Sequence, residues 1–193
     1  KTDANGKYSF SDLPPDTNFK VTKVHPKDWI NGKDSAGDKG GNVSDDQIAD
    51  VTLSSGDDAK EYNFGLRKPA TLAGKVYHDR NDDGNIDADE EGVPTVTVKI
   101  TWTDKDGQEQ SKTTTTAPDG TYLFTDLPPD TTFKVTKVHP EGWKDGKDTV
   151  GDKGGDNPEE DVLGSVTLKS GDEAKEYNFG VHTPVSANPT PVP

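Results

Sequence analysis

The chain contains the segment Tyr122-Leu123-Phe124-Thr125-Asp126-Leu127-Pro128-Pro129-Asp130-Thr131, and it contains nearly the same segment earlier, as Tyr8-Ser9-Phe10-Ser11-Asp12-Leu13-Pro14-Pro15-Asp16-Thr17. The offset between the two is 122 − 8 = 114 residues, and the same offset relates Phe19 to Pro26 to the later Phe133 to Pro140. Further on, Tyr62-Asn63-Phe64-Gly65 returns from Tyr177, at 177 − 62 = 115 residues. One residue has therefore been inserted between these segments in the second copy, and a repeat of this kind indicates domains in tandem.

The two copies differ in completeness. The second copy is complete over residues 70–184, whereas the first copy, residues 1–69, is the C-terminal part of the same repeat and lacks its front half. Half a sandwich leaves an open sheet edge and a bare inner face. We therefore expect the front half of the first copy to come from a part of the protein outside this sequence or from another chain. Residues 185–193 are rich in proline and are expected to form an extended linker.

The hydrophobic pattern has a period of two, which is typical of β-strands with one buried face. The inward positions predicted from this alternation include Val96, Val98, Ile100, Trp102, Tyr122 and Phe124. Asp106-Gly107 and Asp119-Gly120 are turn sequences, and Pro128-Pro129 ends a strand because proline has no N–H to donate. About seven short strands follow, without a helical period. This pattern predicts an all-β sandwich.

Composition restricts the partners of the chain. Its 193 residues carry 36 acidic and 22 basic side chains, a formal charge of −14, which disfavours nucleic acid and anionic membranes and favours cations. Only 27% of the residues are hydrophobic and none is cysteine, so a small extracellular domain of this kind needs a staple other than a disulfide. No arrangement of nucleophile, base and acid is evident, and we expect a protein that is not an enzyme.

A predicted calcium loop would supply the missing staple. Residues 79–90 fit the twelve-residue pattern D-x-[DN]-x-[DN]-G-x₅-E, with Gly84 at the sharp turn and Ile86 expected to point toward the core. The predicted Ca²⁺ ligands are the side chains of Asp79, Asn81, Asp83, Asp87 and Glu90 and the backbone carbonyl of Asn85. The flanking segments read as strands, so the loop would sit on a β scaffold. The alternative interpretation is a solvated acidic loop whose carboxylates repel one another.

A second acidic set lies in a loop of about 25 residues, for which we expect no strands and which cations could order. Its members in the second copy are Asp148, Asp152, Asp156, Glu160 and Asp161, and in the first copy Asp34, Asp38, Asn42 and Asp46. Their spacing matches no fixed metal template, so no ligand set is assigned, and a flexible solvated loop remains the alternative. His25 and His139, at strand ends before proline, are interpreted as structural.

Several motifs in order resemble the B repeats of the serine-aspartate-repeat surface adhesins, the SdrD-type B domain, which is related to collagen-adhesin B modules. They are Gly74-Lys75-Val76-Tyr77-His78-Asp79, Glu91-Gly92-Val93-Pro94-Thr95-Val96-Thr97-Val98, Asp119-Gly120-Thr121-Tyr122, Asp126-Leu127-Pro128-Pro129, Gly154-Gly155-Asp156 and Asn178-Phe179-Gly180. The resemblance implies a prealbumin-like or inverse immunoglobulin sandwich that binds calcium at several sites. It also implies an extracellular place at the bacterial surface or cell wall, with neighbouring repeats as partners and host or matrix proteins bound through other domains.

Some relatives carry a lysine–asparagine cross-link. Lys75 and Asn178 are the candidates by type, but the alternation places their neighbours Val76 and Phe179 inward, so we expect both to face solvent and no bond to form.

The main functional hypothesis is therefore a calcium-stiffened spacer repeat in the stalk of a surface adhesin. The alternative is a module that binds a host protein or glycan directly, through the Trp143 region or an open sheet edge.

Overall fold

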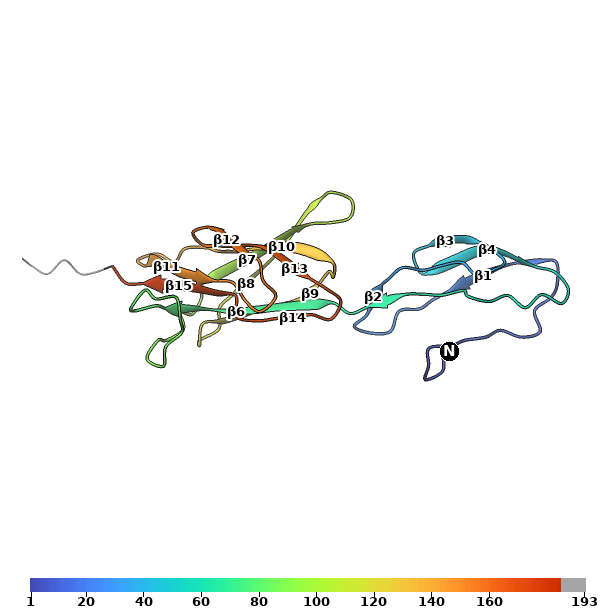
Figure 1. Ribbon diagram of the computed structural model, residues 1–193, viewed down its shortest axis with the longest axis horizontal. Helices are drawn as coiled ribbons and strands as arrows, with labels where there is room; N and C mark the ends of the chain where they lie inside the picture. Colours follow the sequence, from blue (N-terminus) through green and yellow to red (C-terminus); the bar gives the residue numbers. More distant parts are fainter. Residues whose placement is uncertain (185–193) are drawn as a thin grey trace, which may run out of the picture. The chain divides into compact units, whose positions relative to one another are not determined.

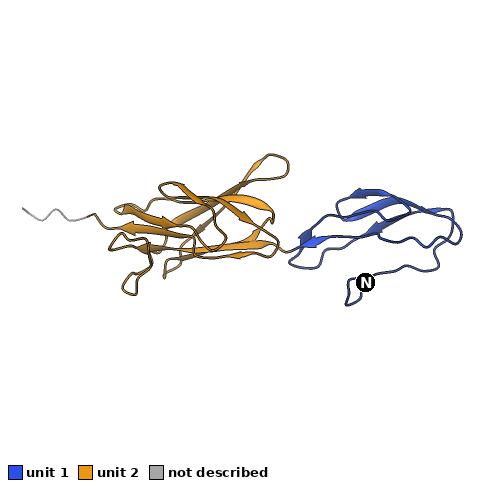
Figure 2. Ribbon diagram, in the orientation of Figure 1, with its two compact units in different colours: residues 1–67 blue, residues 68–193 orange. Residues whose placement is uncertain are grey.

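A computed structural model of the protein describes residues 1–184, so the predicted proline-rich linker, 185–193, lies outside the described residues. The chain divides into two compact units, residues 1–67 and residues 68–193, coloured separately in Figure 2. The described residues form strands and no helix, which confirms the predicted all-β class. No candidate for a membrane-crossing helix occurs among them.

The second unit is a sandwich of two sheets (Figure 1). The first sheet has five antiparallel strands in the order β12 (Asp156–Glu159), β13 (Val162–Leu168), β10 (Thr131–Lys137), β7 (Thr97–Thr103) and β8 (Glu109–Thr115). The second sheet has the order β11 (Lys144–Thr149), β15 (Asn178–His182), β6 (Ala70–His78) and β14 (Glu173–Ala174), and β9 (Thr121–Leu127) also pairs with β6. β15 and β14 run parallel to β6, whereas β9 runs antiparallel to it.

The core lies between the two sheets and follows the predicted alternation. Tyr122 and Phe124 of β9 are buried, while Leu123 between them is 54% exposed. The other predicted inward positions are buried or packed against the core: Val96, Val98, Ile100 and Trp102. The Trp102 ring meets Phe133 edge to face at 5.6 Å between centroids. Burial of large apolar side chains on both inner faces is the main stabilising term of this fold.

The assignment of Val76 and Phe179 to the core is confirmed, because both are fully buried. Their neighbours Lys75 and Asn178 are half-buried rather than fully exposed, and the Asn178 Oδ1 accepts a hydrogen bond from the backbone N of Lys75 at 2.9 Å.

One expectation was wrong. The acid-rich segment after Trp143 contains the strands β11 and β12, so it is not a loop without structure, and together with β14 these strands bring the second unit to ten strands, β6 to β15. β11 pairs with β15 through its backbone, with a shift in register between Asp145 and Asp148. Its side chains show no apolar alternation because polar partners take up their inward face. For that reason the sequence pattern did not reveal the strand.

The first unit has the sheet order β1 (Thr17–Thr22), β4 (Gln47–Leu53) and β3 (Asn42–Ser44), and a separate pair of β2 (Ile30–Asn31) with β5 (Leu66–Arg67). Phe10 is 65% exposed here, whereas its counterpart Phe124 is 3% exposed. An open hollow of about 1210 Å³ lies over this face, lined in part by Phe10, Phe19 and Val51. This face of the first unit is therefore open to solvent.

Candidate metal centre

The acidic loop predicted to bind calcium joins β6 to β7 and leaves the sandwich through a narrow neck. His78 N donates to the carbonyl of Glu91 at 2.9 Å, and Val93 N donates to Val76 O at 2.9 Å. Asp79 N donates to Val181 O at 2.9 Å, which ties the first residue of the loop to β15. The base of the loop is thus held by β6 and β15, which are the first and last strands of the second unit.

Two carboxylates of the loop are buried. Asp79 is fully buried and its two oxygens accept hydrogen bonds from Asp83 N at 3.2 Å and Gly84 N at 2.9 Å. Glu90 is 7% exposed and accepts from Arg80 N at 2.8 Å and Asp87 N at 3.0 Å. The hydrogen bonds that hold both groups come from backbone N–H groups, which orient the carboxylates without neutralising their full charge.

The remaining predicted ligands form the rim of the loop. Asn81 Nδ2 donates to Asp83 Oδ2 and to Asp87 Oδ2, each at 3.1 Å. Asp83 Oδ1 accepts from Asn85 N at 2.7 Å, and this bond is the largest influence that lowers the pKa of Asp83. All six predicted residues therefore belong to one hydrogen-bonded network.

A buried tyrosine lies directly behind this loop. Tyr77, the residue before His78 in β6, is fully buried and its Oη has no hydrogen-bond partner. Burial raises the pKa of Tyr77, and the charges of Asp79 and Glu90 raise it further. The residues thus fit a hard divalent cation, because they offer oxygen donors, carry a surplus of negative charge and include two carboxylates already withdrawn from water.

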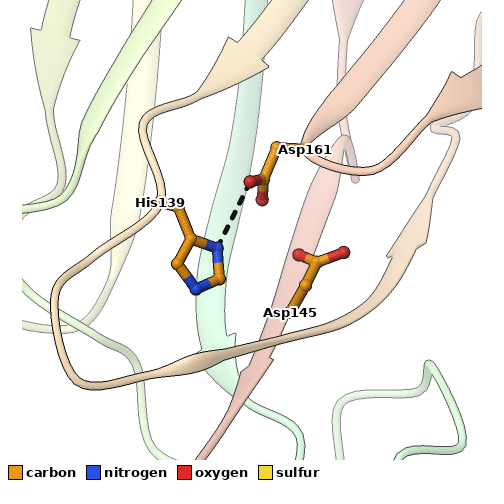
Figure 3. A group of neighbouring side chains, drawn as sticks. All are labelled: His139, Asp145 and Asp161. Carbon is orange, nitrogen blue, oxygen red and sulfur yellow. Dashed lines mark hydrogen bonds and ion pairs between the residues drawn. The ribbon is translucent and has the colours of Figure 1, made fainter.

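The loop differs from the expectation in two respects. Ile86 is 42% exposed and does not reach the core, because Asp79 and Glu90 take the inward positions and the loop tip stands away from the sandwich. Within residues 1–184, the group in which three acidic or histidine ligand atoms lie within 4.8 Å of one another is His139, Asp145 and Asp161 (Figure 3). No three carboxylates of the described loop lie this close together: Asp79, Asp83 and Glu90 accept from backbone N–H groups, and Asp87 accepts from the Asn81 amide.

The basic residues near the loop lie at its periphery. Arg80 forms an ion pair with Glu91, which also contacts His78, and these two contacts lower the pKa of Glu91 to about 2. Lys147 of β11 crosses the outside of the loop and donates to the carbonyl oxygen of Asp82 at 2.6 Å. Gly84 makes room for it, since a side chain at Gly84 would lie 3.1 Å from the Cβ of Lys147 and the residue has a φ of +83°.

The sequence comparisons agree with this architecture. The family model for the SdrD B-like domain matches residues 70–181, more than half of the chain. The chain belongs to the SdrD B-like domain family.

Curated relatives include the serine-aspartate repeat-containing protein D of Staphylococcus aureus strain Newman, which is 34% identical over 194 residues. That match covers 93% of this chain and 14% of the relative. The bone sialoprotein-binding protein of strain MRSA252 is 33% identical over 128 residues, 66% of this chain and 11% of that protein. The chain thus spans a small fraction of the length of these relatives.

The second acidic set of this SdrD B-like domain is not one cluster. Asp148 and Asp161 lie beside Lys137, with their oxygens 4.0 and 2.7 Å from its Nζ. Asp152 accepts from Lys175 N at 2.7 Å. The others point elsewhere: Asp156 accepts from the Ser165 hydroxyl at 2.8 Å and Glu160 is exposed.

The first copy repeats this division. Asp34 and Asp46 lie beside Lys23, with their oxygens 3.2 and 3.0 Å from its Nζ. Asp38 accepts from Lys60 N at 2.8 Å, and Asn42 donates to Asp50 at 2.7 Å. Each copy therefore gathers two of its predicted acids around a lysine and leaves the others apart.

Sequence reasoning missed Lys137 and Lys23. The signal was present in the alternation, because Lys137 occupies the inward phase of Phe133 and Val135 in β10, but a lysine is assigned to the surface by default.

Trp143, the candidate contact for a ligand, packs partly buried against the core, with its ring edge to face with His78 at 4.9 Å.

Proposed function

We propose that this SdrD B-like domain is a calcium-binding spacer repeat in the stalk of a larger bacterial surface adhesin. The buried pair Asp79 and Glu90 at the neck of the loop carries the proposal, because two carboxylates with backbone donors only are poised for a cation. The full set that would hold Ca²⁺ is the one named from the sequence: Asp79, Asn81, Asp83, the Asn85 carbonyl, Asp87 and Glu90. Bound calcium would supply positive charge next to Asp79 and Glu90, which accept their hydrogen bonds from backbone N–H groups.

Stiffening would follow from the position of the loop in the fold. The neck joins Asp79 to β15 and holds the crossing from β6 to β7, so a loop that is rigid at its tip also fixes the crossing between the two sheets. For the chain itself, the backbone N–H groups of Asp83, Gly84 and Asp87 orient the carboxylates in advance, which lowers the entropy lost on binding. Calcium at 1,000 times the dissociation constant would stabilise the unit by about 4 kcal/mol.

The relatives support the cellular role. Two of them carry the names of a serine-aspartate repeat protein and a bone sialoprotein-binding protein, and both are far longer than this chain. By analogy, the repeat would be extracellular, at the cell surface or in the cell wall, and would contact neighbouring repeats while other domains bind the host or matrix protein. The role is structural rather than enzymatic. Trp143 is partly buried against the core and its ring contacts His78, so it has a packing role, which favours the spacer over the direct ligand-binding module.

The test compares Glu90→Gln with Glu91→Gln on the full chain. Glu90 is buried in the loop, whereas Glu91 next to it is exposed, pairs with Arg80 and is not one of the six predicted ligands. We expect a calcium titration by isothermal calorimetry to lose the loop site in Glu90→Gln and to keep it in Glu91→Gln. Thermal unfolding with calcium and with chelator should differ by several degrees for the original chain and for Glu91→Gln alone. Equal melting midpoints with and without calcium for the original chain would reject the proposal.

A further inference from the structure

Lys137 is a buried lysine at the end of β10. Its side chain is 0% exposed, and its Nζ lies 2.7 Å from Asp161 Oδ1 and 2.9 Å from Asp145 Oδ1. The same Nζ donates to the carbonyl oxygen of Gly180 at 3.0 Å and lies 5.7 Å from the centre of the Phe179 ring. A buried ammonium is unfavourable unless oxygen atoms surround it, and here two carboxylates and a carbonyl do so.

The groups around this ammonium are those of a metal site. One ligand atom from each of His139, Asp145 and Asp161 lies within 4.8 Å of the other two, and Figure 3 shows the three side chains converging. A further carboxylate points the same way: the Asp148 side chain is 2% exposed, its Oδ1 has no hydrogen-bond partner, and that oxygen is 4.0 Å from Lys137 Nζ. Carboxylates and a carbonyl are donors that hard divalent cations such as Mn²⁺ and Ca²⁺ accept, and an imidazole is a donor for transition metals.

The first unit contains the same arrangement independently. Lys23 Nζ lies 3.2 Å from Asp34 and 3.0 Å from Asp46, donates to Gly65 O at 2.8 Å, and lies 5.6 Å from the centre of the Phe64 ring. Asn31 replaces Asp145 in this copy and accepts a hydrogen bond from the lysine at 2.7 Å. The lysine, two of its carboxylates, the carbonyl and the aromatic ring therefore recur together, whereas the third carboxylate has changed to an amide.

We propose that the ammonium of Lys137 occupies the cation position of this cluster, so that the cluster works as a metal site with its cation built into the chain. Lys137 belongs to β10 and Asp161 immediately precedes β13, both in one sheet, while Asp145 and Gly180 belong to β11 and β15 in the other. The ammonium thus clamps the two sheets together without calcium. This clamp is separate from the acidic loop, and it accounts for Asp148 and Asp161, the two members of the second acidic set that lie beside Lys137.

The test counts bound ions on the full chain after equilibration with Mn²⁺ or Ca²⁺ and dialysis. Asp161→Asn should bind as many ions as the original chain, because Asp161 serves the lysine and not a metal. Lys137→Ala should be destabilised in chelator, regain stability in Mn²⁺, and bind one more ion than the original chain. The double variant Lys137→Ala with Asp161→Asn should lose that extra ion, and Lys134→Ala, an exposed lysine of the same strand, should gain none.

The inference is overturned if Asp161→Asn loses a bound ion, since the acids would then already hold a metal in the original chain. It is also overturned if Lys137→Ala gains no ion, or stays unfolded in Mn²⁺ as in chelator. The Asp161→Asn count gives its answer even if Lys137→Ala does not fold. Whether or not the loop binds calcium, the difference in bound ions between each of these variants and the original chain stays the same. Failure of the calcium proposal and failure of the clamp are therefore distinguishable.

Discussion

Phe124 and Phe10 hold the same place in the repeat but differ in what covers them, and truncating each to alanine should expose that difference. Phe124 is 3% exposed and meets the Tyr122 ring edge to face at 5.9 Å. Removing a buried phenylalanine side chain destabilises a protein by about 3–5 kcal/mol, through lost transfer energy and the cavity left behind. Phe10 is 65% exposed, so its truncation should cost about 0.5 kcal/mol or less.

Urea unfolding of ¹⁵N-labelled chain, followed by two-dimensional NMR, measures the two units separately within one molecule. Phe124→Ala should shift the unfolding midpoint of amides in residues 68–184 to much lower urea, and Phe10→Ala should leave the midpoint of residues 1–67 nearly unchanged. Similar losses of stability in the two variants would show that the Phe10 face is covered after all. A loss below about 1 kcal/mol in Phe124→Ala would show that the second unit is not held by the core described above.

Three further predictions concern single side chains of the second unit. Burial raises the pKa of Asp148 from its ordinary 3.8 to about 7, so the folded state holds a proton that the unfolded state releases, and stability is lost as pH rises through this range. Asp148→Asn should remove up to about 4 kcal/mol of this loss. The urea midpoint of the variant should therefore exceed that of the original chain by an amount that grows from pH 4 to pH 7 and then levels off. A difference in midpoint that is the same at every pH would contradict this prediction. Gly74→Ala should lower the melting temperature strongly, because a Cβ there would lie 1.7 Å from the carbonyl oxygen of Tyr177. Gly142→Ala is the control: it has open space around it, so its only cost is the backbone φ of +82°, and it should lower the melting temperature less. Thr116→Val should cost about 1–3 kcal/mol in urea unfolding because the buried Thr116 Oγ1 accepts from Val96 N at 2.9 Å. Thr113→Val, on the exposed face of β8, is the control.

The sandwich could be predicted because its signal is local. Alternation around Ile100 and Phe124, with glycine turns between, specifies which side chains enter the core without any knowledge of the partner strand. β11 could not be found in this way. Its inward side chains are Asp145 and Asp148, whose partner Lys137 lies on another strand, so the pattern resembles an acidic loop until the fold brings them together.

The same reasoning separates the two acidic sites. The six predicted ligands of the loop lie within twelve consecutive residues, so their spacing alone assigns Asp79 and Glu90 to one site. The structure joins all six ligands in a single hydrogen-bonded network. The second set depends on a distant cation. A count of carboxylates shows surplus charge, but only the position of Lys137 shows that part of this charge is already balanced within the chain.

The parallel pairing of β6 with β15 determines how the second unit would carry a pulling force. The chain enters through Ala70 at the start of β6 and leaves through His182 at the end of β15, at opposite ends of two strands that run side by side (Figure 1). Tension between these points slides one strand along the other, so the ladder from Val76 and Phe179 to His78 and Val181 is loaded in shear and its bonds must break together. The neck of the acidic loop sits at the far end of this ladder, where Asp79 N holds Val181 O, so whatever stiffens the loop also locks the last rung before rupture.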